Sequence, residues 1–169
     1  MTIRGILPLD HPLVKEQAKK VHRFDRSLQA LVADLFETMH AADGAGLAAP
    51  QIGLSIRVFV ASYNGQDVAL FNPEITKAGG MALGAEGCLS LPGFVGEHLP
   101  RAAMIQVRGK DQHGRPVKLQ AEGYFARVLQ HEIDHLDGIL FTDRLRHPDD
   151  LRPLTPEELA AATVNRVGD

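Results

Sequence analysis

The sequence contains one cysteine among 169 residues, so an internal disulfide is excluded. This scarcity fits a protein of a reducing compartment, and we expect the cytoplasm. Long apolar runs are also missing, since no stretch approaches the roughly 20 residues that span a bilayer. Pro8, Asp10 and Pro12 interrupt the N-terminal region where a secretory signal would need an apolar core. We therefore expect no membrane association.

Basic residues are not in excess. The chain has 18 Lys and Arg against 21 Asp and Glu, a formal net charge of −3. A protein that neutralises phosphates needs a basic surplus, so direct nucleic-acid binding is not expected. The hydrophobic content of 44% and the charged content of 23% are ordinary for a globular protein. Residues 1–169 suffice to bury one core, and we expect a single domain that acts as a monomer.

The spacing of apolar residues predicts helices at three places. The first begins near Asp25 and ends at Asp43-Gly44, with one apolar face formed by Leu28, Leu31, Val32, Leu35, Phe36 and Met39. A second helix is predicted over 123–137. A third has Thr155 as its cap and Pro156 at its first position.

Strands are predicted between these helices, at 56–61, 68–71, 74–77, 104–109 and 116–121. Asn72-Pro73 should end the second strand, and the last two strands should form a hairpin. Gly44 to Gly53 predicts a loop where a ligand approaches the main chain, with a simple turn as the alternative. The segment 93–100 is expected to be a loop at a pocket rim. The order predicts an α+β fold, with antiparallel strands around the central helix and helices at both ends.

The central helix carries the pattern His-Glu-x-x-His at residues 131–135. Residues four apart lie on the same helix face, so His131 and His135 could bind one cation. Glu132 lies close enough to reach a water on that cation without being a ligand. Asp134 is expected to orient an imidazole or to cap a turn. The pattern predicts a metal-binding helix, although it can also arise by chance on a surface helix.

A hydrolytic metal site usually takes three protein ligands, so a third must be found. Phe141 stands where the longer protease pattern would place a histidine. Glu157 and Glu158 are carboxylate candidates, but they look like the first turn of a separate helix. Cys88 is the better candidate, because Gly87 lets the backbone approach a substrate there; the alternative is a small buried hydrophobe. A thiolate with two imidazoles suits iron, zinc, cobalt or nickel.

Three motifs together resemble those of peptide deformylases, in the same order along the chain. They are Gly44-Ala45-Gly46-Leu47-Ala48-Ala49-Pro50-Gln51, Glu86-Gly87-Cys88-Leu89-Ser90 and Gln130-His131-Glu132-Ile133-Asp134-His135. The resemblance runs from about Ile3 to Arg144. It implies a single catalytic domain that removes the N-formyl group from the formyl-methionine of nascent polypeptides and releases formate.

The resemblance also implies residue roles. Cys88, His131 and His135 would bind the metal, and a metal-bound water would attack the formyl carbon. Glu132 would be the general base and then the general acid. Gln51 and the backbone N–H of Leu89 match the family's oxyanion-stabilising positions.

Substrate contacts follow from the same resemblance. Ala45, Gly46 and Gly87 would offer main-chain hydrogen bonds to the peptide. The methionine pocket would be walled by residues at helical spacing, namely Tyr124, Arg127, Val128 and His131, with Arg127 contributing its aliphatic stem.

Supporting residues are implied as well. Glu86 and Arg101 correspond to a family ion pair that would fix the Cys88 loop. Asp134 would contact a ligand histidine without itself binding the metal, with a solvated helix carboxylate as the alternative.

The resemblance implies Fe(II) in the cell, with Zn, Ni or Co as alternatives in purified protein. Relatives often end in a basic helix that docks on the ribosome. Here the residues from His147 onward include five acids (Asp149, Asp150, Glu157, Glu158 and Asp169) and two arginines (Arg152 and Arg166), a formal −3. Ribosome association through this acidic segment is therefore doubtful.

Two rival functions remain open from the residues. A general metallopeptidase is disfavoured by Phe141. An inactive or purely structural metal module would be expected to lose Glu132, Gln51 or Cys88, and all three are present.

Overall fold

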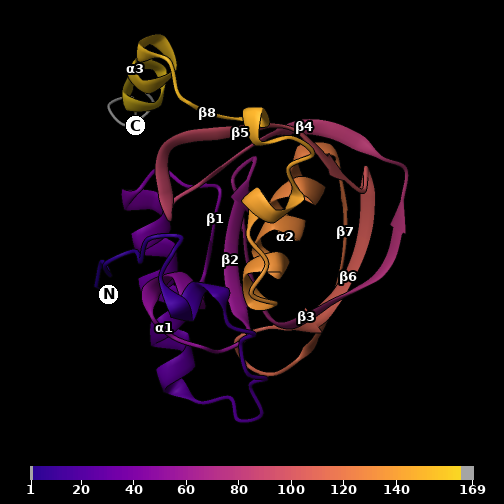
Figure 1. Cartoon of the computed structure of the whole chain (residues 1–169). Helices are drawn as coiled ribbons and strands as arrows, with labels where there is room; N and C mark the ends of the chain where they lie inside the picture. The colour runs from indigo at the N-terminus through magenta and orange to yellow at the C-terminus, as the bar shows by residue number, and fades with distance from the viewer. Residues whose placement is uncertain (1, 165–169) are drawn as a thin grey trace.

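The computed structural model of the chain describes residues 2–164, and within them lie three α-helices and eight strands (Figure 1). The helices are α1 (Arg26–Ala41), α2 (Gly123–Leu136) and α3 (Pro156–Val164). The strands are β1 (Gly46–Ala48), β2 (Val58–Tyr63), β3 (Gln66–Gly79), β4 (Ala82–Cys88), β5 (Leu91–Arg101), β6 (Met104–Lys110), β7 (Pro116–Glu122) and β8 (Leu151–Pro153).

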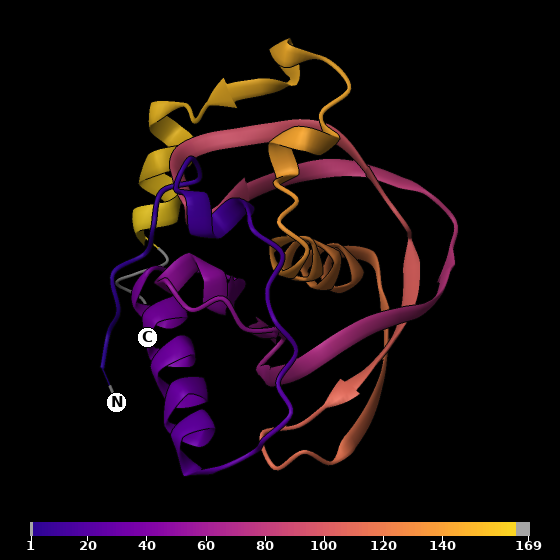
Figure 2. The ribbon, with the colours of Figure 1, turned by 60° about the horizontal axis from the view of Figure 1, so that its bottom comes forward.

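The strands form two antiparallel sheets around α2. One sheet has the order β1-β2-β3-β6-β7, and the other has the order β4-β5-β8. Every residue of α2 from Phe125 to Leu136 is buried. Figures 1 and 2 show this helix in the middle of the molecule with strands on both sides. The α+β fold of helices and antiparallel strands expected from the sequence is confirmed.

Strand β2 is apolar on both faces because a helix covers each of them. Phe59 and Ala61 belong to the same apolar cluster as Leu129 and Ile133 of α2. Val58 and Val60, which point the other way along a strand, cluster with Leu35 and Met39 of α1. This sandwiching of β2 fixes the position of α2 relative to α1.

Helix α1 agrees with the apolar spacing. Asp25 caps it by accepting a hydrogen bond from the Ser27 N–H at 2.9 Å. Its buried face includes Leu31, Leu35 and Met39. The predicted helix at this place is confirmed.

Strand β3 corrects one expectation. Asn72-Pro73 does not end the strand, which continues to Gly79 with a register shift between Phe71 and Glu74. Asn72 adopts a positive φ of 48°, and its side chain exchanges two hydrogen bonds with the Val21 backbone at 2.7 and 2.8 Å. These bonds compensate for the interrupted ladder, so a bulge replaces a strand end.

The hairpin β4–β5 was not predicted as strands. Residues 93–100, expected to be a loop, lie within β5, and Cys88 is the last residue of β4. Glycines and prolines lower the strand propensity of this hairpin. One of them, Gly84, leaves room for the Arg127 guanidinium, since a Cβ there would lie 2.9 Å from it and the guanidinium would have to shift.

The segment 44–53 is more regular than expected. Gly46–Ala48 forms the edge strand β1, and Ala49–Ile52 forms a short 3-10 helix. The hairpin β6–β7 and the helix α2 lie where the sequence predicts them.

The C-terminal segment contains β8 and α3. Thr155 and Glu158 form a reciprocal cap at the start of α3, with N–H to oxygen distances of 2.7 and 3.2 Å. The predicted third helix is thus confirmed, whereas Arg166 and Asp169 lie outside the described residues. Among residues 2–164, no helix is long and apolar enough to cross a membrane.

Candidate active site

Three potential metal-ligand atoms converge between α2 and the end of β4. His131 and His135 lie one turn apart on α2, and their Nε2 atoms are 3.2 Å apart. The Cys88 Sγ lies 3.3 Å from the His135 Nε2. The three atoms lie within 4.8 Å of one another. A thiolate and two imidazoles in this arrangement could hold a transition metal.

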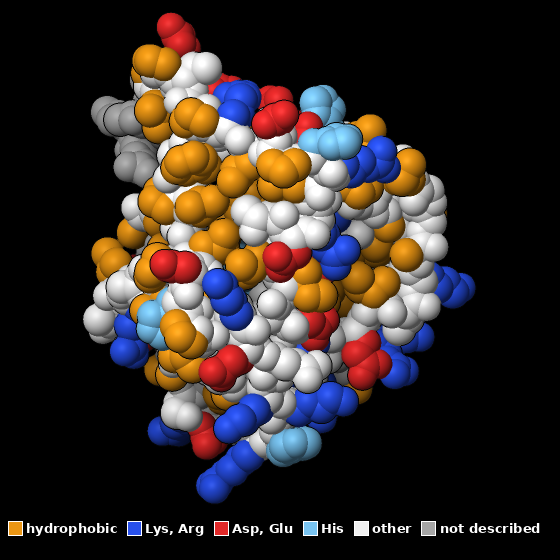
Figure 3. Space-filling view, in the orientation of Figure 1, with side chains coloured by type: hydrophobic (Ala, Val, Ile, Leu, Met, Phe, Trp, Pro, Cys, Tyr) orange, Lys and Arg blue, Asp and Glu red, His pale blue; other side chains and the backbone are white. Residues whose placement is uncertain are grey.

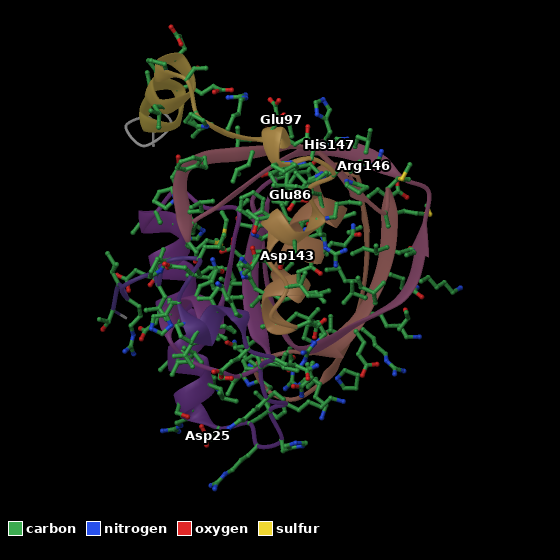
Figure 4. All side chains as sticks on the ribbon, viewed as in Figure 1. Asp25, Glu86, Glu97, Asp143, Arg146 and His147 are labelled. Carbon is green, nitrogen blue, oxygen red and sulfur yellow. The ribbon has the colours of Figure 1, made fainter. Side chains whose placement is uncertain are left out.

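Glu86 lies directly behind these residues, and Figure 4 shows it close to α2. Its Oε2 lies 2.9 Å from the His131 Nδ1. A carboxylate at this nitrogen orients the ring and leaves Nε2 free to face a metal. Burial acts to raise the pKa of Glu86, but the bonds to Arg101 and His131 outweigh it and lower the pKa well below its usual range.

Arg101 joins Glu86 to Asp134. Its Nε and Nη2 donate to Glu86 at 2.7 and 2.9 Å, and its Nη1 donates to Asp134 at 2.5 Å. Arg101 is only 4% exposed. The ion pair between Glu86 and Arg101 expected from the resemblance is therefore present.

Asp134 corrects another expectation. It is buried rather than solvated, and its carboxylate binds two arginines, Arg101 and Arg144, instead of a histidine. On the helix, Asp134 and Glu132 lie on opposite flanks of the two-histidine face, and the flank of Asp134 meets Arg101 and Arg144. Asp134 therefore reaches His131 only through Arg101 and Glu86.

Both histidines lie in surroundings that suit a metal cation. Burial lowers the pKa of His135 well below its usual value, which keeps the ring neutral as a metal ligand must be. Burial opposes charge on His131 too, but its contacts with Cys88 and Glu86 raise its pKa to about 10. The groups that favour a proton at His131 also favour a metal cation there.

Glu132 lies beside this cluster and is 3% exposed. Its Oε2 is buried and has no hydrogen-bond partner among the described residues. Burial raises the pKa of Glu132 to about 7, with the charge on Glu86 contributing. A carboxyl group with such a pKa can accept and release a proton near neutral pH.

Gly46 of β1 packs against Glu132. A Cβ at Gly46 would lie 2.7 Å from the Glu132 Cδ, closer than real Cβ contacts come. A side chain at position 46 would therefore force the Glu132 carboxylate to move away from the edge strand.

Gln51 is fixed with its amide nitrogen toward Cys88. Its Oε1 accepts the Ala48 N–H at 2.8 Å, which assigns the other terminal atom as nitrogen. That Nε2 donates to the Ser90 Oγ at 3.1 Å and lies 3.5 Å from the Cys88 Sγ. Gln51 is 1% exposed, so the donor is held rigidly at the site.

A pocket of about 310 Å³ opens onto these groups. Its lining includes almost every residue singled out from the sequence, from three separate segments: Ala45, Gly46, Gln51, Glu86, Gly87, Cys88, Leu89, Tyr124, Arg127, Val128, His131 and Glu132. Arg101, Asp134 and His135 are absent from that lining and lie behind it. Leu89 also packs on Gly44, where a Cβ would lie 2.6 Å from the Leu89 Cδ1.

Arg127 has a polar contact that its expected role did not include. Its guanidinium donates to the Glu86 carboxylate at 2.9 Å and to the carbonyls of Leu99 and Ala82 at 3.1 and 2.9 Å. The arginine thus ties α2 to the β4–β5 hairpin, beyond lining the pocket with its stem.

Residues around the site to which the sequence analysis gave no role include Ser90, Leu91, Arg144 and Leu154. Ser90 follows Cys88 in the quoted motif and could have been noticed as a polar neighbour. Arg144 pairs with Asp134, ten residues earlier, and Leu154 reaches the pocket from beyond residue 150, so neither belongs to a recognisable local pattern.

Comparisons with known proteins agree with this geometry. A family model described as polypeptide deformylase matches residues 3–150. The peptide deformylase of Dehalococcoides mccartyi (strain CBDB1) is 45% identical over 160 residues, covering 94% of this chain and 95% of that protein. That of Pelotomaculum thermopropionicum is 44% identical over 158 residues, covering 94% and 99%.

Solved structures give the same result. The peptide deformylase from Thermus thermophilus superposes with a TM-score of 0.84 at 45% identity, covering 98% of this chain and 96% of that one. The one from Synechococcus elongatus, solved in complex with actinonin, superposes with a TM-score of 0.82 at 36% identity, covering 94% and 85%.

Proposed function

The chain belongs to the polypeptide deformylase family, and from its site we propose that it hydrolyses the N-formyl group from formyl-methionine peptides at a metal centre. One observation carries the proposal. The potential ligand atoms of Cys88, His131 and His135 lie within 4.8 Å of one another, beside the buried Oε2 of Glu132, for which the described part of the chain offers no hydrogen-bond partner.

Cys88, His131 and His135 would hold the metal. The donor set fits, because one thiolate and two neutral imidazoles suit iron, zinc, cobalt or nickel, and Glu86 orients His131 from behind. We propose Fe(II) as the metal in the cell, with Zn, Ni or Co able to replace it after purification. When bound, such a metal supplies Lewis-acid activation of water near neutral pH.

Glu132 would act as the general base and then as the general acid. Its carboxylate takes a proton as water adds to the formyl carbon, and then gives a proton to the departing methionine nitrogen. The buried position supports this role, because burial brings the pKa of Glu132 to about 7. A carboxyl group with the usual pKa of about 4.3 would be a weaker base.

Gln51 and the Leu89 N–H would stabilise the charge that develops on the formyl oxygen. The Gln51 amide is already oriented by Ala48 and Ser90, so it needs no reorganisation during the reaction. Loss of one such donor typically costs about 2.7–4 kcal/mol of barrier.

The peptide would bind as an added strand beside β1. That strand is at the edge of its sheet, so one side of its backbone has no neighbouring strand among the described residues. Ala45 and Gly46 on one side of the pocket and Gly87 on the other would supply main-chain hydrogen bonds. The methionine side chain would lie against Tyr124, Val128 and the stem of Arg127 on α2.

A deformylation assay tests the proposal. Metal-loaded protein, prepared without oxygen, should release formate from formyl-Met-Ala-Ser but leave the unformylated peptide intact. Glu132→Gln should lower kcat by about 100-fold or more, since general acid–base catalysis typically contributes at least that. Glu157→Gln is the matched control, because Glu157 is exposed in the first turn of α3.

Two results would contradict the proposal. One is the absence of turnover by the metal-loaded wild type, and the other is equal turnover by Glu132→Gln. Actinonin, found bound to the relative from Synechococcus elongatus, should inhibit this protein as well.

We further propose that the chain works as one catalytic domain and as a monomer.

Asp149, Asp150 and Glu157 give the C-terminal segment an acidic surface, which does not suit contact with ribosomal RNA.

A further inference from the structure

The C-terminal segment reaches the active-site pocket, although it lies beyond residue 150, where the match to the family model ends. Strand β8 pairs with β5 through Leu151, Arg152 and Pro153. The next residue, Leu154, continues this pairing by donating its N–H to the Gly93 carbonyl at 2.8 Å. Leu154 is half-buried and forms part of the pocket lining.

Arg152 fixes the segment in this position. Its guanidinium donates to Glu97 of β5 at 2.9 and 3.1 Å. It also donates to both carboxylate oxygens of Glu158 in α3, at 2.8 and 2.9 Å. Figure 4 shows Glu97 at the upper edge of the molecule, beside the chain leading into β8. Leu154 therefore lies between β8 and α3, which Arg152 links to each other and to β5.

Leu154 belongs to an apolar part of the pocket rim. Phe94, which is 40% exposed, and Leu91 line the same pocket from β5. Figure 3 shows hydrophobic side chains gathered below the C-terminal helix on this face of the molecule. Because Leu91 and Phe94 follow Gly87 along the chain, this rim continues the wall opposite the edge strand β1.

An extended peptide in the pocket would present alternate side chains to the same side. If the methionine side chain enters the pocket, the second side chain points away and the third returns to the protein. The third residue of the substrate is then the first after methionine whose side chain can meet the apolar rim.

Resting on the deformylase function proposed above, we propose that Leu154 is a specificity-determining residue that contacts the third side chain of the substrate. Together with Phe94 it favours an apolar residue there over a small polar one. This contact comes from a segment beyond residue 150, where the family-model match ends, and so lies outside the three motifs to which we assign the reaction.

The test compares formyl-Met-Ala, formyl-Met-Ala-Leu and formyl-Met-Ala-Ser with the metal-loaded protein. The wild type should prefer leucine over serine at position three by roughly tenfold in kcat/KM, the lower end of the range for one methylene in an apolar pocket, because Phe94 and Leu154 are only partly buried. Leu154→Ala should bring this ratio close to one, through KM rather than kcat, and should lower kcat/KM less for formyl-Met-Ala than for formyl-Met-Ala-Leu. Leu83→Ala, at a leucine 51% exposed outside the pocket lining, is the control and should keep the wild-type ratio.

Binding gives a second readout that does not need turnover. In a Glu132→Gln background, Leu154→Ala should weaken the affinity for formyl-Met-Ala-Leu by the same factor. An unchanged preference in Leu154→Ala, or an equal loss on all three substrates, would overturn the Leu154 proposal alone. No turnover of any formyl peptide by the wild type would overturn the deformylase function and this proposal with it.

Discussion

Replacing Glu86 with glutamine should destabilise the protein far more than the same change at an exposed ion pair. Glu86 is 6% exposed and accepts from Arg101 twice, from Arg127 once, and contacts His131. An amide of the same shape keeps one acceptor oxygen but removes the negative charge. Two buried guanidinium groups then lose their shared counter-charge.

The expected loss follows from this geometry. Breaking a buried charge network by removing one partner typically costs about 3–5 kcal/mol. Because the glutamine oxygen still accepts one hydrogen bond, we expect about 3 kcal/mol, at the lower end. For a chain of 169 residues, each kcal/mol lowers Tm by about 2–4 °C, so Tm should fall by about 6–12 °C.

The assay is urea unfolding followed by circular dichroism, on protein treated with a chelator so that metal binding does not contribute. Glu74→Gln is the matched control, since Glu74 also pairs with an arginine, Arg108, but both side chains are about half exposed or more. Exposed pairs contribute little, so this variant should unfold like the wild type. Equal urea midpoints for Glu86→Gln and Glu74→Gln would refute the view that the buried charge network stabilises the packing of the β4–β5 hairpin against α2.

Two further predictions test the site and its surroundings. Gly46→Ala should abolish most of the activity while leaving the fold intact by circular dichroism, because the new Cβ displaces the Glu132 carboxylate; Gly5→Ala, where a Cβ would meet nothing within 4 Å, should be fully active. Arg152→Ala should raise the pKa of Glu158, which hydrogen bonds from Arg152 lower to about 2, back toward its usual value. In the wild type this contact therefore stabilises the fold fully at pH values above about 4.3, the pKa of a glutamate in the unfolded chain. The stabilisation is lost as the pH falls through about 2, the pKa of Glu158 in the folded protein. A carboxylate titration by NMR that finds the same Glu158 pKa in both proteins would contradict the assignment of this contact.

The helices could be predicted from the sequence because apolar residues recur at helical spacing and capping residues mark the helix ends. Helix α1 has the capping Asp25 and a regular face of leucines, and α3 has Thr155 before Pro156. The hairpin β4–β5 was missed, because its glycines and prolines suppress the alternation by which strands are recognised. Its stability comes instead from contacts such as Arg127 over Gly84, which join residues 43 positions apart.

The sequence also determined the family, through three motifs whose residue types have specific chemical uses. His131, Glu132 and His135 are fixed relative to one another by helix geometry alone, since residues three and four apart share a face. The proposed metal-ligand set therefore needed only one addition from elsewhere, and Cys88 was the single cysteine in the chain.

Tertiary structure decided everything that depends on distant segments meeting. It placed the Cys88 Sγ at 3.3 Å from the His135 Nε2 and directed Asp134 to two arginines rather than to a histidine. It also brought Leu154 into the pocket. A local pattern determines which face of an element a side chain occupies, but only the packing of that element determines what the side chain meets.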